Sequence, residues 1–201
     1  MLYCAAGKIA ITPSRELIDS LRDNPRNRFT GVYSELSARI VVTSDGERRF
    51  VILTAELGMI PAQAELDERL KKELGVEPGT VFGCTHNHQS MLVIKEGEGP
   101  AGFVCESWMN TYMDLIHQKI IDGVKDCIGR LEPARMGCAS GSSYIGVSRD
   151  YPSPIGTLQS SNFQGYSDHE LSVIRFERLD GTAIALVVNY VCMGPSYFPT
   201  P

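Results

Sequence analysis

The sequence predicts an α/β domain in which a mixed β-sheet is flanked by helices. Strand-like and helix-like segments alternate along the chain, and two Asp-Gly pairs, at residues 45–46 and 180–181, are typical of hairpin turns. A hairpin requires antiparallel strands, whereas strand–helix–strand units favour parallel ones, so both kinds of pairing are expected. With 201 residues, 43% of them hydrophobic, the chain can bury one sizeable core, and we predict a single domain over 1–201.

The first strands are expected around the Asp45-Gly46 turn. Residues 8–12 predict a short strand that ends at Pro13, and the polar residues 14–37 are expected to be mostly loop. Residues 39–43 and 50–54 predict the two strands of the hairpin. The second of them is apolar on both faces, which is typical of a central strand.

Two helices and one strand are expected in the middle of the chain. Residues 61–74 predict an amphipathic helix with Pro61 at its first position, and residues 107–130 predict a long helix because apolar side chains recur at helical spacing. Between them, residues 80–85 predict a strand with His86 at its C-terminal end.

Three further strands are predicted in the C-terminal part of the chain. Residues 135–146 are strand-like but rich in glycine and serine, and residues 150–168 are expected to be a polar loop broken by prolines and glycines. Residues 171–176 and 183–190 predict the second hairpin, around Asp180-Gly181.

Composition narrows the functional classes. The net charge is −5 and no basic block is present, so nucleic acid is not expected as a partner. No apolar run approaches the roughly 20 residues that span a bilayer, and the N-terminus lacks the pattern of a signal peptide, so we expect a cytoplasmic protein without a transmembrane segment. The six cysteines are widely spaced without a CxxC pair, and we interpret them as reduced core residues.

The stretch 83–90, GCTHNHQS, is the candidate for metal chemistry. His86 and His88 stand two residues apart at a strand end, and side chains at that spacing share one face of an extended backbone. Neutral imidazole is a good zinc ligand, and one histidine can bind the metal while the other acts as an acid or base. The alternative interpretation of this stretch is a solvated polar turn without a metal. His117, in the long helix, is expected to have a surface or packing role, and His169 to be exposed.

A series of short motifs, in order, resembles the N-terminal part of the neutral/alkaline non-lysosomal ceramidase family. The series covers nearly the whole chain, and its pieces are 6–7 with 11–13, 38–42 with 45–46, 51–56, 84–88, 146–149, 167–176, 180–181 and 188–193. The resemblance implies that the chain is the N-terminal part of a larger ceramidase-like domain. It also implies hydrolysis of an amide C–N bond with one catalytic zinc.

The resemblance assigns roles to three residues. It implies that His86 is a zinc ligand, that His88 lines the site and assists the chemistry, and that Arg149 holds the substrate or the developing oxyanion. Such a cation would stabilise the negative charge that forms when an amide carbonyl is attacked, and zinc would polarise that carbonyl.

Three departures from the family pattern bear on zinc. The Ser-Gly-Pro that follows the family's THxH is replaced by Gln89-Ser90-Met91, and Met193 stands where a second histidine ligand is expected. A thioether is soft and uncharged, which makes it a poor zinc ligand. The family's glutamate and tyrosine ligands come from a later part of the domain. We therefore expect a fragment, a relative that has lost the chemistry, or a chain completed by a partner or a missing C-terminal half.

The leading hypothesis is a zinc-dependent amide (N-acyl) hydrolase that resembles neutral ceramidase, with a small-molecule amide or lipid as its substrate. The alternative is a non-catalytic ceramidase-like domain that binds a lipid or another small ligand. A third hypothesis is that the chain is a structural or interaction domain without a pocket.

Overall fold

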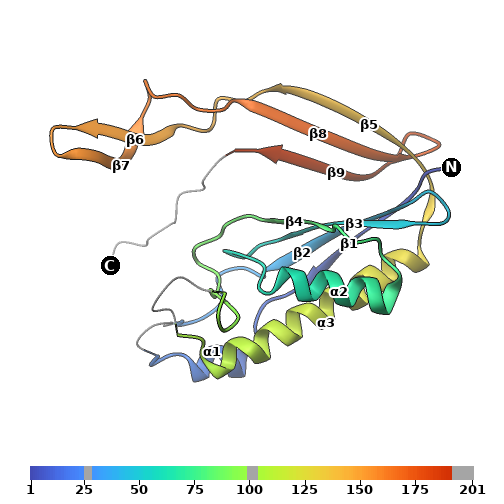
Figure 1. Ribbon diagram of the computed structural model, residues 1–201, viewed down its shortest axis with the longest axis horizontal. Coiled ribbons are helices and arrows are strands. Elements are labelled where there is room, and N and C mark those ends of the chain that lie inside the picture. The colour runs from blue at the N-terminus through green and yellow to red at the C-terminus, as the bar shows by residue number, and fades with distance from the viewer. Residues whose placement is uncertain (25–28, 99–103, 192–201) are drawn as a thin grey trace. The chain divides into compact units, whose positions relative to one another are not determined.

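The computed structural model describes residues 1–24, 29–98 and 104–191, which fold as two compact units. Of the described residues, those up to 134 belong to the first unit and 135–191 belong to the second. Hydrogen bonds connect seven strands in the order β4-β3-β2-β1-β5-β8-β9, and β6 and β7 form a separate hairpin (Figure 1). The predicted mixed sheet with flanking helices is confirmed, while the extent of a single domain over 1–201 stays a prediction.

The first unit is built on four sheet strands. β1 (Tyr3–Ala10) pairs antiparallel with β2 (Ser37–Ser44), which pairs antiparallel with β3 (Arg49–Ala55) across the predicted Asp45-Gly46 turn. β4 (Val81–Cys84) pairs parallel with β3, as expected after a crossover helix. β5 (Glu132–Ser142) begins beside Tyr3 and Cys4 of β1.

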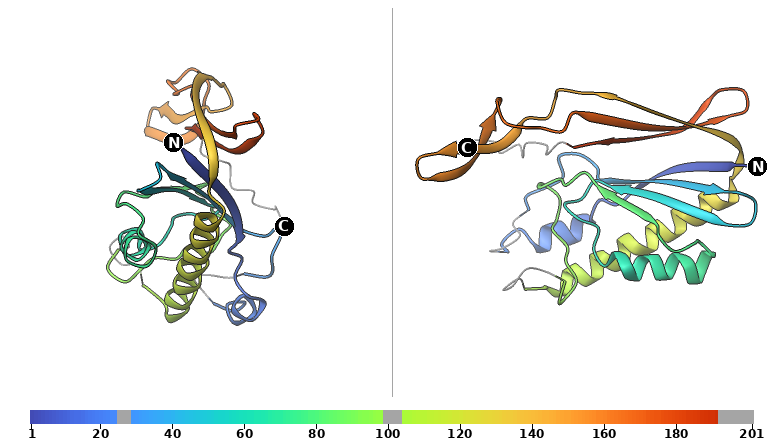
Figure 2. Two further views of the ribbon diagram at one scale, coloured as in Figure 1. Left: turned by 90° about the vertical axis from the view of Figure 1, so that its right-hand side faces the viewer. Right: turned by 45° about the horizontal axis from the view of Figure 1, so that its top comes forward.

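Two helices cover one face of this sheet. α3 (Ser107–Gly129) packs on β1 and β2, and α2 (Gln63–Leu74) packs against α3 (Figure 2). Gly123 permits the close approach of α3, because a Cβ there would lie 2.7 Å from Cδ1 of Ile40. The buried core includes Ile40, Val42, Leu53, Leu66, Leu70, Ile116, Ile120 and Val124.

The helix boundaries correct two expectations. α1 (Arg15–Ser20) lies within the predicted loop 14–37; Ser14 caps it by accepting a hydrogen bond from the backbone N–H of Leu17 at 3.2 Å, and Ile18 is buried. α2 begins at Gln63 rather than Pro61, because Ala62 adopts a left-handed conformation with φ of 48°.

The second unit consists of strands. β8 (Glu170–Arg178) and β9 (Ala183–Tyr190) pair antiparallel, which confirms the predicted hairpin. The predicted loop 150–168 is wrong, because β6 (Ser148–Ser153) and β7 (Gly156–Asn162) form a hairpin. A two-stranded hairpin has an outer side that needs no ladder hydrogen bonds, so it tolerates Pro152 within a strand.

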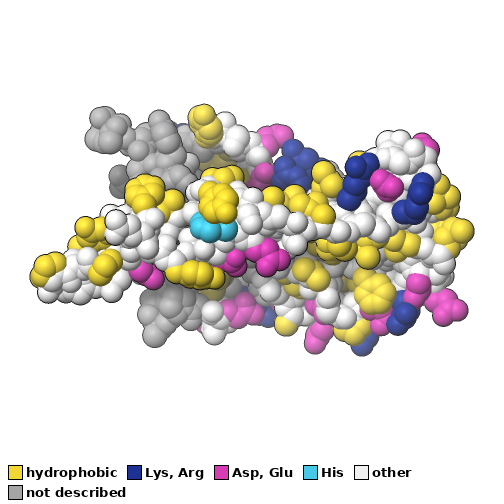
Figure 3. All heavy atoms as spheres, turned by 90° about the horizontal axis from the view of Figure 1, so that it is seen from above, with side chains coloured by type: hydrophobic (Ala, Val, Ile, Leu, Met, Phe, Trp, Pro, Cys, Tyr) yellow, Lys and Arg dark blue, Asp and Glu magenta, His cyan; other side chains and the backbone are white. Residues whose placement is uncertain are grey.

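The two units differ in burial. Among the described residues, Phe176 is the one hydrophobic side chain of the second unit that is fully buried, and all others belong to residues 1–134. Figure 3 shows apolar side chains exposed along the strands of the second unit. The five described cysteines are free; Cys4 and Cys127 are buried, but the exposed Cys84 and Cys138 contradict the expectation of core residues. No helix of the described part is long and apolar enough to cross a membrane.

Candidate functional site

The predicted His-x-His motif lies where the parallel strands β3 and β4 end. The ladder continues beyond both strands, because the N–H of Thr85 donates to the carbonyl of Ala55 at 3.0 Å and that of Asn87 to Leu57 at 3.2 Å. The loop 85–90 is therefore held beside the loop 56–58 at the carboxyl edge of the sheet. Ligands of α/β proteins commonly bind at this edge.

The imidazole of His86 is fixed by the backbone. Its Nδ1 lies 2.9 Å from the carbonyl oxygen of Gly58. A carbonyl only accepts hydrogen bonds, so Nδ1 carries a proton, and in the neutral imidazole the lone pair then lies on Nε2. A histidine that binds a metal through one ring nitrogen usually donates a hydrogen bond from the other, often to a backbone carbonyl. The bond from Nδ1 of His86 to Gly58 is of this kind.

His88 lies next to His86. Their ring centroids are 4.7 Å apart and the ring planes are inclined at 83°. With Zn–N bonds of about 2.0–2.1 Å and tetrahedral angles, two imidazoles on one ion would have centroids about 5 Å apart. The observed separation is close to that value. The rings meet in a loop in which His86 has φ of 53°, and not in the extended strand that the spacing argument assumed.

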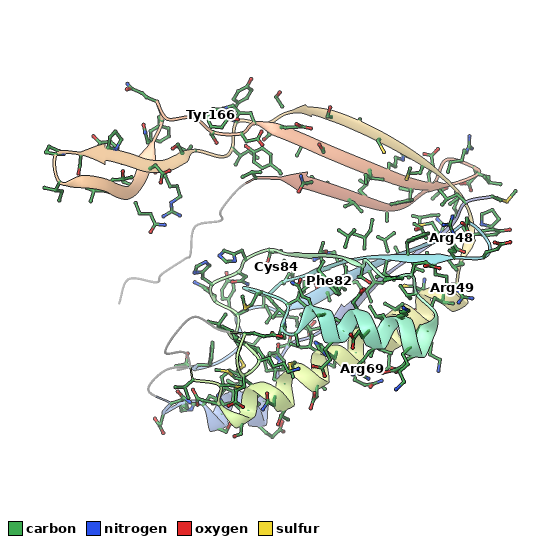
Figure 4. All side chains as sticks on the ribbon, viewed as in Figure 1. Arg48, Arg49, Arg69, Phe82, Cys84 and Tyr166 are labelled. Atoms are coloured by element: carbon green, nitrogen blue, oxygen red, sulfur yellow. The ribbon has the colours of Figure 1, made fainter. Side chains whose placement is uncertain are left out.

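Cys84 is a third side chain at this loop. Its Sγ donates to the same carbonyl of Gly58 at 3.4 Å, and it is exposed at the end of β4 (Figure 4). Even so, no group of three or more His, Cys, Asp or Glu side chains in the described ranges is arranged to hold a metal. A catalytic zinc normally has three protein ligands, so the described residues alone do not complete such a site.

Glu56 begins the loop 56–58 and anchors it to β2. Its carboxylate accepts hydrogen bonds from the N–H and hydroxyl of Ser37, at 2.8 and 3.0 Å, and from Arg39 at 3.0 Å. Burial acts to raise the pKa of this carboxyl, but the hydrogen bonds from Arg39 and Ser37 outweigh it and the pKa is lowered. Glu56 is therefore an ionised anchor for the turn that leads to Gly58, a role that its place in a short sequence motif did not indicate.

The remaining predicted site residues and histidines belong to other parts of the chain. Arg149 lies on β6 in the second unit, and Met193 lies outside the described residues. His117 has the expected packing role: it is buried in α3, and its Nε2 donates to the carbonyl of Pro61 at 2.9 Å. Its burial lowers the pKa of the imidazole. His169 is half-buried rather than exposed, with its ring 4.5 Å from that of Tyr144.

A small cavity adjoins the same loop. Its volume is about 170 Å³, and Asn87, Gln89, Ser90 and Met91 line it together with Ile18, Phe29 and Leu36. A cavity of about 150 Å³ holds a benzene-sized molecule, whereas a drug-sized ligand requires about 300–1,000 Å³. The cavity therefore has room for a short apolar group.

The fold is that of part of the solved ceramidases. The chain is similar to a ceramidase complexed with C2 (21% identity, TM-score 0.63) and to neutral ceramidase from Pseudomonas aeruginosa (21% identity, TM-score 0.62). Each match covers 93% of this chain, which spans 30% and 31% of the length of those two chains. No protein-family model and no curated protein sequence matches the chain.

Proposed function

We propose that this chain carries the histidine portion of a zinc-dependent amide hydrolase. The observation that carries the proposal is the His86–His88 pair, whose rings lie 4.7 Å apart at the carboxyl edge of a sheet with a ceramidase-like strand arrangement. The tie between Nδ1 of His86 and Gly58 supports it further, since Nε2 is then available to a metal.

The two histidines have distinct tasks in this proposal. His86 would bind zinc through Nε2, and His88 would take up or release a proton beside it. Zinc itself would supply Lewis-acid chemistry that polarises an amide carbonyl. Zinc needs further ligands, and we propose that this chain does not supply all of them. They would come from another group of this chain in place of Met193, from a partner chain, or from a C-terminal half of the domain.

The role proposed for Arg149 rests on the motif resemblance alone. A guanidinium is always charged and offers several donors, which suits it to hold a substrate carbonyl or the charge that develops there. The substrate class is a small-molecule amide or a lipid amide. A cytoplasmic location stays a prediction from the sequence.

The direct test is the zinc content of the purified protein after mild dialysis. We expect bound zinc in the wild-type protein and a loss of it in His86→Ala, with a smaller loss in His88→Ala. His169→Ala is the matched control, because this histidine lies in the second unit beside Tyr144. Equal zinc contents in His86→Ala and the control, or no zinc in the wild type even with a partner fragment present, would contradict the proposal.

Met193 provides a second test. A Met193→His substitution should raise zinc affinity if this position takes part in the site, because imidazole is a far better zinc ligand than a thioether. An unchanged affinity would remove position 193 from the proposed ligand set.

The cavity favours a second candidate function, the non-catalytic binding of a small ligand. Apolar side chains such as Phe29 and Met91 line it beside the polar Asn87 and Gln89, a mixture typical of small-molecule sites. Saturable binding of a short N-acyl amide, unaffected by His86→Ala and by chelators, would favour this second function over hydrolysis.

A further inference from the structure

A single buried hydroxyl joins the two loops that hold His86. Ser90 is 8% exposed; its Oγ accepts a hydrogen bond from the N–H of Gly58 at 3.1 Å and donates one to the carbonyl of Asn87 at 2.8 Å. The first bond joins the loop 56–58 to the loop 85–90, and the second closes the loop 85–90 on itself. The hydroxyl thereby satisfies two backbone groups that the ends of β3 and β4 leave without ladder partners.

The same glycine presents its carbonyl to His86. The N–H of Gly58 is held by Ser90, and its C=O receives the proton of Nδ1 at 2.9 Å. Asn87, which follows His86 directly, is fixed on its carbonyl by Ser90 and on its N–H by Leu57. Gly58, His86, Asn87 and Ser90 therefore form a closed ring of three hydrogen bonds and one peptide bond, and the Ser90 hydroxyl makes two of those hydrogen bonds.

We infer that Ser90 is a positioning residue that sets the tautomer of His86. With Gly58 held in place, the proton stays on Nδ1 and the lone pair of Nε2 is available to a metal. Without the hydroxyl, the N–H of Gly58 loses its bond to the histidine loop, the carbonyl of Gly58 is held less firmly against Nδ1, and the imidazole exchanges between its two neutral tautomers. The connection to zinc rests on the proposed function, but the connection to the tautomer does not.

The test is NMR of the metal-free protein with ¹⁵N-labelled histidine, recorded on the alkaline side of the imidazole titration that the same spectra follow. Wild-type His86 is expected in the Nδ1–H form. Ser90→Ala should give a mixture of both tautomers, and Ser90→Thr, which keeps the hydroxyl, should restore the wild-type spectrum. Loss of a hydrogen bond that orients a metal-binding histidine typically costs 10–100-fold in metal affinity, so Zn²⁺ titration of Ser90→Ala should show a loss in that range.

Ser44 provides the matched control. It is equally buried, and its Oγ accepts a hydrogen bond from the N–H of Gly46 at 3.0 Å, in the turn at the other end of β3. Ser44→Ala removes the same kind of bond and should leave the tautomer of His86 and the Zn²⁺ affinity unchanged. If Ser90→Ala does not fold, Ser90→Cys tests the same link with a weaker hydrogen-bonding group.

The outcomes separate the two proposals. A His86 in the Nε2–H form in the wild type, or an unchanged tautomer in Ser90→Ala, overturns the positioning role of Ser90 whatever the zinc result. A shifted tautomer in a protein that binds no zinc supports the positioning role and counts against the proposed hydrolase.

Discussion

The two units use their apolar residues in opposite ways. In the first, Leu53 on β3 has no exposed surface, and α2 and α3 close over the sheet. In the second, Leu186 and Val188 on β9 are 61% and 58% exposed, and no described helix belongs to this unit. Burial of apolar surface is the main source of folding free energy, so the first unit should contribute more of it than the second.

The largest effect should come from truncating a buried leucine of the first unit, with an exposed leucine of the second unit as its comparison. Leu53→Ala creates a cavity in a closed core and should lower the free energy of unfolding by about 2–5 kcal/mol. Leu186→Ala removes an exposed side chain and should change it by less than about 0.5 kcal/mol. Urea denaturation measures both. Equal losses would mean that β9 is buried in solution, which would break the comparison.

A pH titration should reveal the buried thiol of the first unit. Burial raises the pKa of Cys4 from 9.0 to about 11, because the thiolate is desolvated. In the unfolded chain the thiol ionises first, so stability should be fully present below pH 9 and fall between pH 9 and about 11. The loss is on the order of 1–3 kcal/mol. A Cys4→Ala variant should have a flatter curve over this window, and an identical slope in both proteins would refute the assignment to Cys4.

Removing the hydroxyl of one tyrosine in each unit compares how much their hydrogen bonds contribute to the free energy of unfolding. The buried hydroxyl of Tyr112 donates to the carbonyl of Ile11 at 2.6 Å, so Tyr112→Phe should cost about 1–2 kcal/mol. Tyr190 is half-buried, donates to Ser143 at 2.9 Å and accepts from Gly146 at 2.8 Å. Tyr190→Phe should cost less than about 1 kcal/mol, since water can replace its bonds, and faster hydrogen exchange should be confined to the amide of Gly146 and its neighbours. A larger loss for Tyr190→Phe would reverse the ranking.

The smallest effect is one of reactivity. Brief treatment of the native protein with a thiol reagent should label the exposed Cys138 and Cys84, as read by mass spectrometry. Cys4 and Cys127 should remain unmodified until the protein unfolds, because both are buried and burial raises the pKa of each thiol. Early labelling of Cys127 would show that α3 separates readily from the sheet.

Sequence patterns predicted most of the fold where local and tertiary preferences agree. The hairpin at Asp45-Gly46 and the helix 107–130 were identifiable because turn chemistry and apolar spacing each point to one structure. The hairpin of β6 and β7 was missed because its prolines and glycines are equally typical of loops. The helix α1 was missed because its six residues are too few to establish a period, although Ser14 offered a capping signal.

The candidate site was predictable only in part. Spacing alone suggested that His86 and His88 share a face, and they are neighbours, but through a left-handed turn that costs a non-glycine residue about 1–3 kcal/mol. The tie from His86 to Gly58 joins residues 28 positions apart, and the role of Ser90 depends on the same long-range approach. Neither contact leaves a local trace in the sequence, so only the structure could reveal them.

The edge formed by β9 has a consequence for handling the protein. β9 is the last strand in the hydrogen-bonded order of the described residues, and its sequence, AIALVVNY, has no charge, no proline and no glycine. Strands with this composition at an uncovered edge pair readily with copies of themselves and seed cross-β aggregates. A Leu186→Lys substitution would place a charge on this strand and oppose such pairing. It should raise the concentration up to which the protein stays monomeric, without disturbing the histidine loop.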